Sequence, residues 1–571
     1  MTHIFDAPED FAATALAGFC HAYRNHVRAV PHGALRAAAS PKGKVALVVG
    51  GGSGHYPAFL GYVGQGFADG AVAGDVFASP STSAVAQVAR LANKGGGVIL
   101  GFGNYAGDVL NFGAAAERLR ADGIDVRILA VTDDVASAKL EEAHKRRGIA
   151  GDFLVFKIAG SAAEAGLDID EVEVIAQRAN KNTVSFGVAF DGCTLPGQGA
   201  PLFTVDKGTV ALGLGIHGEP GIRNEPMVSA REMADMLLAP LLNERPAGHN
   251  GRIAVVLNGL GRTKYEELFV LWHHVAARLE NEGMTIIEPE VGELVTSLDM
   301  AGCSVSLTWL DEELEKFWCA PADAPALRRG IVAVPAGTSD EIIVDETTSP
   351  IEAASEEGRK SGACVAQLLA RMAATLADAE EELGRIDAQA GDGDHGQGMA
   401  RGSRAAAQAA AHAVKEGAGP ATVLALAGDA WADRAGGTSG ALWGVALRAL
   451  GTTLDNDAVI SAANLAAAVQ SALDAVVRLG GAKPGDKTLV DAFIPFSEAF
   501  SAEVEKGRSL PQAWKLAAEK ATEAAKATAK LTPKLGRARP LAERSIGHPD
   551  AGAISLALCA RTIADELAKS R

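Results

Sequence analysis

Two histidines lie in glycine-rich turns, where a side chain is open to a ligand. His55 closes GGGSGH at residues 50–55, directly after an apolar run at 45–49, and His217 lies in GLGIHGEPG at residues 213–221. Beyond a strand end His55 could serve as a general base, and the irregular backbone around His217 suits an imidazole nucleophile. A tight turn with a surface histidine explains the first motif equally well, and a lone histidine is more often structural than catalytic.

A carboxylate follows a second apolar run. Asp108 ends GNYAGD at residues 103–108, after the run at 98–102. It could orient an imidazole or accept a proton from a substrate hydroxyl. Helix capping is the alternative, and capping accounts for Asp133 and Asp134 after a third run. Ligands bind beyond the carboxyl ends of parallel strands, so two acid–base groups at two such ends favour a functional site.

Three aspartates stand close together in the second half. Asp387, Asp392 and Asp394 lie in RIDAQAGDGDHGQG, interleaved with glycines. Carboxylates this close repel one another unless a cation compensates, and hard oxygen ligands select Mg²⁺ or Ca²⁺. The spacing is not that of an EF-hand. A solvated acidic turn is the alternative, but the pattern favours a metal site that phosphate groups complete.

Two segments resemble nucleotide-binding motifs without fitting them. Residues 213–218 spell G-x-G-x-x-G, but a dinucleotide fingerprint needs a helix next, and Glu-Pro-Gly at 219–221 predicts a turn. GAKPGDKT at 481–488 nearly spells a Walker A motif, but Asp486 separates Gly485 from Lys487. We therefore predict neither motif.

Two further loops of the second half are candidates for binding. GGTSG at 436–440 precedes a helical pattern, and such a loop at a helix N-terminus suits a phosphate. A plain helix start capped by Thr438 or Ser439 is the alternative. The long polar segment at 536–553 contains Arg537, His548 and Asp550 and either connects two helices or lines a site.

The elements that position these residues change in kind along the chain. Apolar runs at 45–49, 98–102, 126–132 and 154–158 alternate with helical patterns at 83–91 and 114–120, which predicts a parallel sheet covered by helices. Runs at 253–257 and 304–310 indicate a second α/β unit after about residue 185. Strand patterns nearly vanish after a segment with four prolines at 320–360, and Ala-rich helical runs follow. We predict an α/β domain of two subdomains at 1–330, a linker at 331–358 and an all-helical bundle at 359–571.

Composition bounds the class of protein. The 571 residues carry a net charge of −17, which argues against a nucleic-acid partner or an anionic membrane surface. The six cysteines are scattered and form no C-x-x-C pair, so neither a disulfide scaffold nor a thiolate zinc site is expected. The polar start and the lack of a long apolar run predict a cytoplasmic protein.

Taken together, the motifs resemble the dihydroxyacetone kinase family. GGGSGH, GNYAGD and GIHGEPGI match its substrate-binding domain, and GDGDHG, GGTSG, GDKTLVDA and ERSIGHPDAGA match its nucleotide-binding domain, in the family's order and over nearly the whole chain. Members with both domains in one chain use ATP, whereas members with separate chains use a phosphotransferase-system phosphoprotein. The resemblance thus implies an ATP-dependent kinase of a short ketose, usually dimeric through the substrate domain, with an eight-helix barrel as its second domain.

The resemblance also implies roles for individual residues. His217 would hold the ketose as a hemiaminal, which selects ketones over polyols such as glycerol. His55 would be the base for the phosphorylated hydroxyl with Asp108 assisting, while Gly52 and Ser53 cradle the substrate. Asp387, Asp392 and Asp394 would hold Mg²⁺ on the ATP phosphates. The positions that match nucleotide contacts are His395, Gly396, Thr438, Ser439, Arg537 and Asp550.

Three departures from the family pattern bear on the substrate, and a fourth bears on the nucleotide. Tyr56 replaces a glutamate, Phe59 a small or polar residue, and Gly103 a lysine next to the Asn-Tyr pair. Loss of the lysine opens volume beside Asp108 for a larger ketose such as erythrulose, and this branch of the family includes erythrulose kinases. Ala551 stands where the family has proline, which should leave nucleotide binding intact. FMN cyclisation from FAD and a non-catalytic regulator are alternatives, although regulators typically lack the histidines and aspartates present here.

Overall fold

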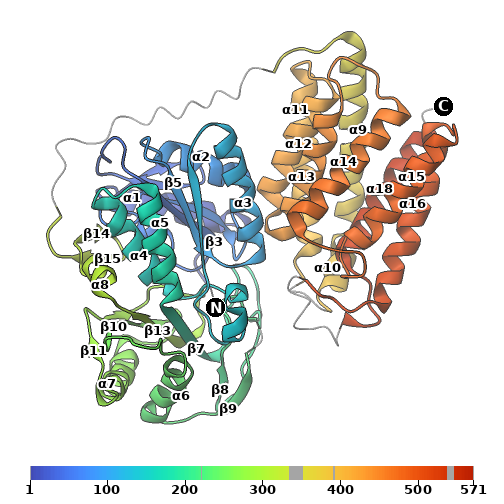
Figure 1. Cartoon of the computed structure of the whole chain (residues 1–571). Coiled ribbons are helices and arrows are strands. Elements are labelled where there is room, and N and C mark those ends of the chain that lie inside the picture. Colours follow the sequence, from blue (N-terminus) through green and yellow to red (C-terminus); the bar gives the residue numbers. More distant parts are fainter. Residues whose placement is uncertain (1, 220, 333–350, 390–392, 536–544, 570–571) are drawn as a thin grey trace. The chain divides into compact units, whose positions relative to one another are not determined.

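The computed structural model of the chain describes residues 2–219, 221–332, 351–389, 393–535 and 545–569. The chain divides into two units, Met1–Val344 and Asp345–Arg571, the first mixed and the second helical (Figure 1). Most of the segment predicted as a linker, residues 333–350, lies outside the described residues.

The first sheet has the strand order β1-β2-β4-β3-β5-β6. Strands β4, β3, β5 and β6 run parallel, while β1 and β2 add antiparallel strands at one edge. The parallel part contains the predicted strands at 45–49, 98–102 and 126–132. Its elements are β1 (Val27–Val30), β2 (Gly33–Arg36), β3 (Ala46–Ser53), β4 (Gly70–Val76), β5 (Val98–Gly103) and β6 (Val126–Val131).

Helices bury both faces of this sheet, as its nearly continuous apolar strands require. On one face α2 (Thr82–Ala92) and α3 (Ala106–Ala121) pack Val85 and Phe112 against Val48 and Leu100. On the other face Leu47 and Val49 share a core with α4 (Gly151–Glu164), and α5 (Ile169–Lys181) packs beside α4. Figure 1 shows these helices around the blue sheet. The strand ends are thereby held rigidly while their loops stay available for a site.

The predicted strand at 154–158 is wrong, because these residues lie in the middle of α4. The helix contacts β3 and β5 of the first sheet and β7, β10 and β13 of the second, so it is buried on all sides. A helix that is apolar all round has no periodic stripe, and its apolar run cannot be told from a buried strand.

The second sheet is mixed rather than parallel. Its order is β11-β10-β13-β7-β8-β9, with β12 also on β10, and the pairs from β10 to β9 are antiparallel. Helices α6 (Ala230–Leu242) and α7 (Tyr265–Asn281) share a core with it, and α1 (Phe11–Ala22), α8 (Glu312–Trp318), β14 (Ala322–Ala324) and β15 (Leu327–Arg329) complete the unit. The strands are β7 (Thr183–Asp191), β8 (Thr209–Leu212), β9 (Arg223–Pro226), β10 (Arg252–Gly259), β11 (Thr285–Ile286), β12 (Glu290–Gly292) and β13 (Ala301–Trp309).

The helices of the second unit form a closed ring. Each helix of the ring contacts the next, and the last contacts the first. The order is α9, α11, α12, α13, α14, α15, α16 and α18. Glycines allow close approach, since a Cβ on Gly444 would lie 2.7 Å from the Cβ of Ala432. The helices are α9 (Glu356–Asp378), α10 (Glu380–Asp387), α11 (His395–Lys415), α12 (Pro420–Ala435), α13 (Gly437–Thr453), α14 (Ala462–Gly480), α15 (Val490–Glu505), α16 (Leu510–Ala527) and α18 (Ala551–Lys569).

The predicted fold class, an α/β half followed by a helical barrel, is confirmed. Within the described part of the chain, no helix has both the length and the apolar character needed to cross a membrane. All six cysteines carry free thiols.

Candidate active site

The structure brings the two candidate histidines into direct contact. His55 follows β3 and His217 lies between β8 and β9, so loops of both sheets meet here. Their Nε2 atoms are 3.0 Å apart, and the rings meet edge to face with centroids 4.7 Å apart. His55 is only 2% exposed, so the interpretation of a surface histidine in a turn is wrong.

Burial and one backbone contact fix the protonation of His55. Its Nδ1 lies 2.7 Å from the carbonyl oxygen of Thr296, which can only accept, so Nδ1 carries the hydrogen. Burial, followed by the charge of His217, lowers the pKa of His55 to about 3. Phe77 stacks on the ring at 5.0 Å. The His55 imidazole is therefore neutral at physiological pH, with its Nε2 lone pair directed at His217.

A carboxylate holds the other side of His217. Glu219 Oε2 accepts a hydrogen bond from the His217 backbone N–H at 3.0 Å, and Oε1 lies 3.4 Å from His217 Nδ1. Burial acts to raise the pKa of Glu219. His217, through its charge and its hydrogen bond, outweighs this effect together with the charge of Arg147, so the pKa of Glu219 lies well below its usual range. A Cβ on Gly215 would lie 2.1 Å from Glu219 Oε2, so glycine is required for this close approach.

An ion-pair chain anchors Glu219 in turn. Arg147 Nη1 lies 3.7 Å from Glu219 Oε2, and Arg147 Nη2 donates to Asp134 Oδ2 at 2.7 Å. Asp134 therefore does more than cap the turn: its Oδ1 accepts the backbone N–H of Ala136 at 3.0 Å, while its Oδ2 pairs with Arg147. The side chain of Asp133 accepts the backbone N–H groups of Ile149 and Gly151 and so fixes the start of α4.

Asp108 lies in the first turn of α3, directly beyond β5, and is 9% exposed. The N-cap position of this helix is held by Tyr105, whose side chain makes no capping hydrogen bond, so Asp108 is not the N-cap residue. The N-terminal end of a helix favours a carboxylate in the first turn. Burial, followed by the charges of Asp133 and Asp108, raises the pKa of Asp152 well above its usual value.

The loop residues predicted to cradle the substrate also build the local backbone. The Ser53 hydroxyl donates to the carbonyl oxygen of Gly74 at 2.6 Å, which ties β3 to β4. A Cβ on Gly52 would lie 2.8 Å from the backbone nitrogen of Ala78. Glycine at 52 is therefore explained by packing, and a substrate contact there stays a prediction.

Of the three departures that bear on the substrate, only Gly103 lies beside a buried carboxyl group, that of Asp152. Tyr56 and Phe59 lie elsewhere. Tyr56 is 45% exposed and its hydroxyl bonds that of Tyr23 at 3.3 Å. Phe59 packs against Gly51, whose Cβ would lie 2.3 Å from its ring. Tyr56 therefore contributes to the surface rather than to the pocket.

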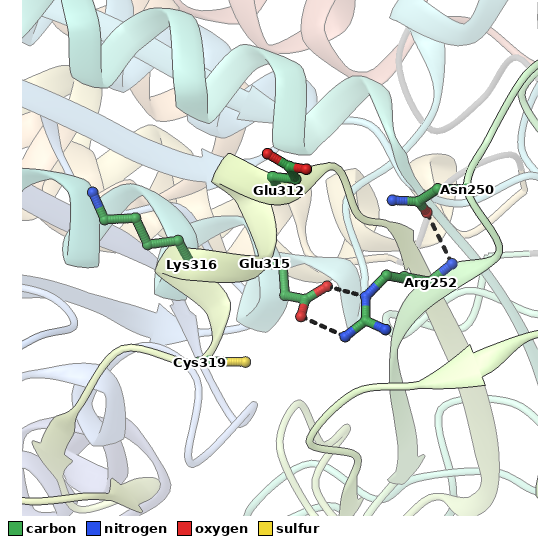
Figure 2. A pocket seen from close by; sticks show the side chains of 6 residues that line it. All are labelled: Asn250, Arg252, Glu312, Glu315, Lys316 and Cys319. Carbon is green, nitrogen blue, oxygen red and sulfur yellow. Dashed lines mark hydrogen bonds and ion pairs between the residues drawn. The ribbon is translucent and has the colours of Figure 1, made fainter.

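A hollow of about 470 Å³ lies apart from the histidine pair (Figure 2). It is lined by Asn250, Arg252, Glu312, Glu315, Lys316 and Cys319. Its Arg252 and Glu315 are already joined by two hydrogen bonds of 2.5 and 2.6 Å. The charged groups that a ligand would need are thus partly occupied, and we assign no site to it.

In the helical unit, His395 joins the starts of three helices. It opens α11, its Nε2 lies 3.0 Å from Ser555 Oγ on α18, and its Nδ1 lies 3.3 Å from Ser439 Oγ on α13. Thr438 stands beside Ser439 in the first turn of α13. Unpaired N–H groups of converging helix N-termini favour a phosphate. Gly396 has a packing reason, since its Cβ would lie 1.9 Å from the carbonyl oxygen of Glu380.

The predicted metal ligands converge in part. Burial, followed by the charge of Asp387, raises the pKa of Asp394 to about 6, and burial with Asp387 and Asp491 raises that of Asp550 to about 7. Asp392 and Arg537 lie outside the described residues. Among the described residues alone, no three metal-ligating side chains group together. The charge of Asp387 thus acts on both Asp394 and Asp550, and their carboxyl oxygens are donors of the kind that a hard divalent cation prefers.

Sequence reasoning missed several residues of both sites. Lys487, dismissed with the false Walker motif, is 6% exposed and donates to the carbonyl oxygen of Ser545 at 2.6 Å. The signal that could have found it is the match of GDKTLVDA, which contains Lys487, to the family's nucleotide-binding domain. Glu219 was treated only as a turn residue, and Thr296 stands 241 residues from its partner His55. Contacts over such a distance leave no local pattern.

Comparison with known proteins decides the family. Residues 17–326 match the Dak1 domain and residues 389–565 match the DAK2 domain. The chain belongs to the dihydroxyacetone kinase family. The family predicted from the motifs is thereby confirmed, and with it the prediction that the chain is a kinase.

The similar members of the family cover almost the full chain. A D-erythrulose kinase of Mycolicibacterium smegmatis is 56% identical over 99% of this chain and 98% of its own. An L-erythrulose kinase of Pectobacterium atrosepticum is 55% identical over 98% and 95%. The human triokinase/FMN cyclase is 34% identical over 92% of each chain. The dihydroxyacetone kinase from C. freundii in complex with AMP-PNP and Mg²⁺ is 30% identical, with a TM-score of 0.53 over 99% of both chains.

Proposed function

We propose that the chain transfers the γ-phosphoryl group of ATP to a terminal hydroxyl of erythrulose, held as a hemiaminal on His217. The observation that carries this proposal is the contact of the two Nε2 atoms at 3.0 Å, with Thr296 behind His55 and Glu219 behind His217. The identity of 55–56% to two erythrulose kinases supports the substrate.

One arrangement of protons satisfies all three contacts. His55 Nδ1–H donates to Thr296, His217 Nε2–H donates to His55 Nε2, and His217 Nδ1–H donates to Glu219. His217 then carries hydrogen on both ring nitrogens beside a carboxylate, and His55 is placed to remove the proton from Nε2.

Capture of the ketose follows from this arrangement. His55 takes the Nε2 proton of His217, and the freed lone pair forms a bond to the carbonyl carbon. The π electron pair of the C=O bond moves to the oxygen, and this oxygen then takes from His55 the proton that His217 had lost. The product is a hemiaminal whose imidazolium ring stays paired with Glu219. Glycerol has no carbonyl carbon and cannot be captured.

Phosphoryl transfer needs a base for the substrate hydroxyl and a site for the nucleotide. We assign the first role to His55 with Asp108 assisting, once the hemiaminal has formed. His395, Gly396, Thr438, Ser439, Arg537 and Asp550 would contact the nucleotide, and Asp387, Asp392 and Asp394 would hold Mg²⁺. The metal would neutralise charge on the ATP phosphates. The homodimer and the cytoplasmic location stay predictions.

The test is an ADP-release assay with Mg-ATP and D-erythrulose, L-erythrulose, dihydroxyacetone or glycerol. The proposal expects the highest kcat/KM for one erythrulose enantiomer and no stimulation by glycerol. If dihydroxyacetone is the best substrate, the ketose assignment is wrong and the kinase assignment stands. If no ketose stimulates ADP release, the kinase proposal fails, and formation of FMN from FAD tests the cyclase alternative.

A further inference from the structure

Two buried polar atoms on residues beside Gly103 have no hydrogen-bond partner among the residues described. They are the hydroxyl oxygen of Tyr105 and Oδ1 of Asp152. Asp152 is 3% exposed, so water does not reach it freely. An unpaired buried polar atom destabilises a fold, and each such atom in a folded protein calls for an explanation.

Both residues face the same point beside Gly103. A Cβ on Gly103 would lie 3.2 Å from Cε2 of Tyr105 and 3.4 Å from Oδ2 of Asp152. A second glycine, Gly148, lies close to the other oxygen, since its Cβ would be 3.0 Å from Oδ1 of Asp152. Glycine at both positions lets the carboxyl group of Asp152 lie close to the backbone, and a long side chain at 103 would come between Asp152 and Tyr105.

This point adjoins the nucleophile. The Tyr105 ring meets the His217 ring edge to face, with centroids 4.6 Å apart. Tyr105 holds the N-cap position of α3 directly beyond β5, and Asp152 lies in the first turn of α4. The two side chains therefore line the wall of the candidate active site that begins at His217 and continues to Gly103.

The charge around this wall favours a neutral hydroxyl group as ligand. Burial, followed by the charges of Asp133 and Asp108, raises the pKa of Asp152 well above its usual value. This shift favours the neutral carboxyl form of Asp152, which has one O–H donor as well as acceptor capacity. Burial, followed by the charge of Glu219, raises the pKa of Tyr105 well above its usual value, which leaves its O–H as a donor.

We propose that Tyr105 and Asp152 form a subsite for the additional hydroxyl-bearing carbon of a four-carbon ketose. The inference rests on the proposed function and adds the residues that recognise the longer substrate. Dihydroxyacetone has one carbon fewer, so bound on His217 it would leave the subsite empty. A site with unpaired polar groups rejects a substrate that lacks the matching hydroxyl.

The experiment compares kcat/KM for erythrulose and for dihydroxyacetone in four variants. Tyr105→Phe and Asp152→Ala each remove polar atoms of the subsite and should lower the erythrulose-to-dihydroxyacetone ratio about tenfold, the worth of one buried hydrogen bond. Asp152→Asn has nearly the shape and the hydrogen-bonding capacity of a neutral carboxyl group and should keep the ratio within about twofold of wild type. Tyr23→Phe is the matched control, because the Tyr23 hydroxyl pairs only with exposed Tyr56 among the contacts described.

The measured quantity is the ratio of kcat/KM for erythrulose to kcat/KM for dihydroxyacetone. A variant that loses activity equally on both ketoses therefore does not support the subsite. Unchanged ratios in Tyr105→Phe and Asp152→Ala, with activity retained, overturn the subsite. If Asp152→Ala does not fold, Tyr105→Phe, which loses one oxygen atom, decides alone. Wild-type enzyme without ketose-dependent ADP release refutes the proposed function itself, and that is known before any variant is made.

Discussion

Replacing Glu219 with glutamine removes the negative charge beside His217 while keeping the shape of the Glu219 side chain. The carboxylate accepts the His217 backbone N–H at 3.0 Å and faces Nδ1 at 3.4 Å. Glutamine can still accept the backbone N–H, but it no longer stabilises the imidazolium ring of the hemiaminal. The effect should therefore appear in ketose capture rather than in folding.

The magnitude follows from the geometry. A hydrogen bond to a charged group contributes about 1.5–3 kcal/mol, and the long Nδ1–Oε1 distance places this contact at the lower end. About 1.5 kcal/mol corresponds to roughly a tenfold change in an equilibrium constant. We expect Glu219→Gln to lower kcat/KM for the ketose about tenfold and to leave the affinity for ATP unchanged.

The assay measures ADP release over a range of ketose concentrations, together with an ATP titration. Glu225→Gln is the matched control, because Glu225 pairs with exposed Arg223 on β9. A change of less than twofold in Glu219→Gln would show that the carboxylate does not support His217. Equal losses in both variants would point to a general disturbance of this loop.

Three further predictions concern the two sites. His217→Ala should abolish ketose binding and leave ATP binding intact; equal ketose affinity in the variant would refute the assignment of the nucleophile. Asp392→Ala should remove Mg²⁺-dependent ATP binding, which an unaltered ATP titration would contradict. The pKa of His55 is lowered to about 3 by burial, so between the ordinary value of about 6.5 and about 3 the unfolded state binds a proton that the folded state does not. Stability from His55 is thus fully present above pH 6.5 and falls with pH by up to about 1.4 kcal/mol per unit. His55→Asn should show a shallower loss of unfolding free energy in urea between pH 6.5 and pH 4.5, and identical slopes would be inconsistent with a buried neutral imidazole.

Local pattern was enough for much of the fold. The apolar runs that became β3, β5 and β6 are short and contain β-branched residues, and those of β3 and β5 lead into glycine-containing turns, so the sequence alone predicts them as strands. The alanine-rich second half became a ring of helices because small residues at helical spacing favour one architecture. The strand predicted at 154–158 was wrong because α4 is enclosed between two sheets. Apolar residues therefore occur all round this helix, and no helical period is visible in its sequence.

The site was readable only in outline. Glycines mark the turns that carry His55 and His217, and the aspartate–glycine pattern marks the end of the barrel where the charge of Asp387 acts on both Asp394 and Asp550. The supporting groups were not readable. Thr296 and Arg147 come from segments far along the chain from their partners, and the packing of the two sheets against α4 brings Thr296 to His55 and Arg147 to Glu219.

The central claim is that a ketose binds covalently to His217, and NMR of an erythrulose labelled with ¹³C at its carbonyl carbon tests it most directly. On mixing with stoichiometric enzyme, the account predicts that the ketone signal is replaced by that of a tetrahedral carbon bound to nitrogen, and that His217→Ala leaves the ketone signal unchanged. A wild-type spectrum that retains only the signals of the free ketose and its hydrate, at concentrations that saturate ADP release, would contradict the account.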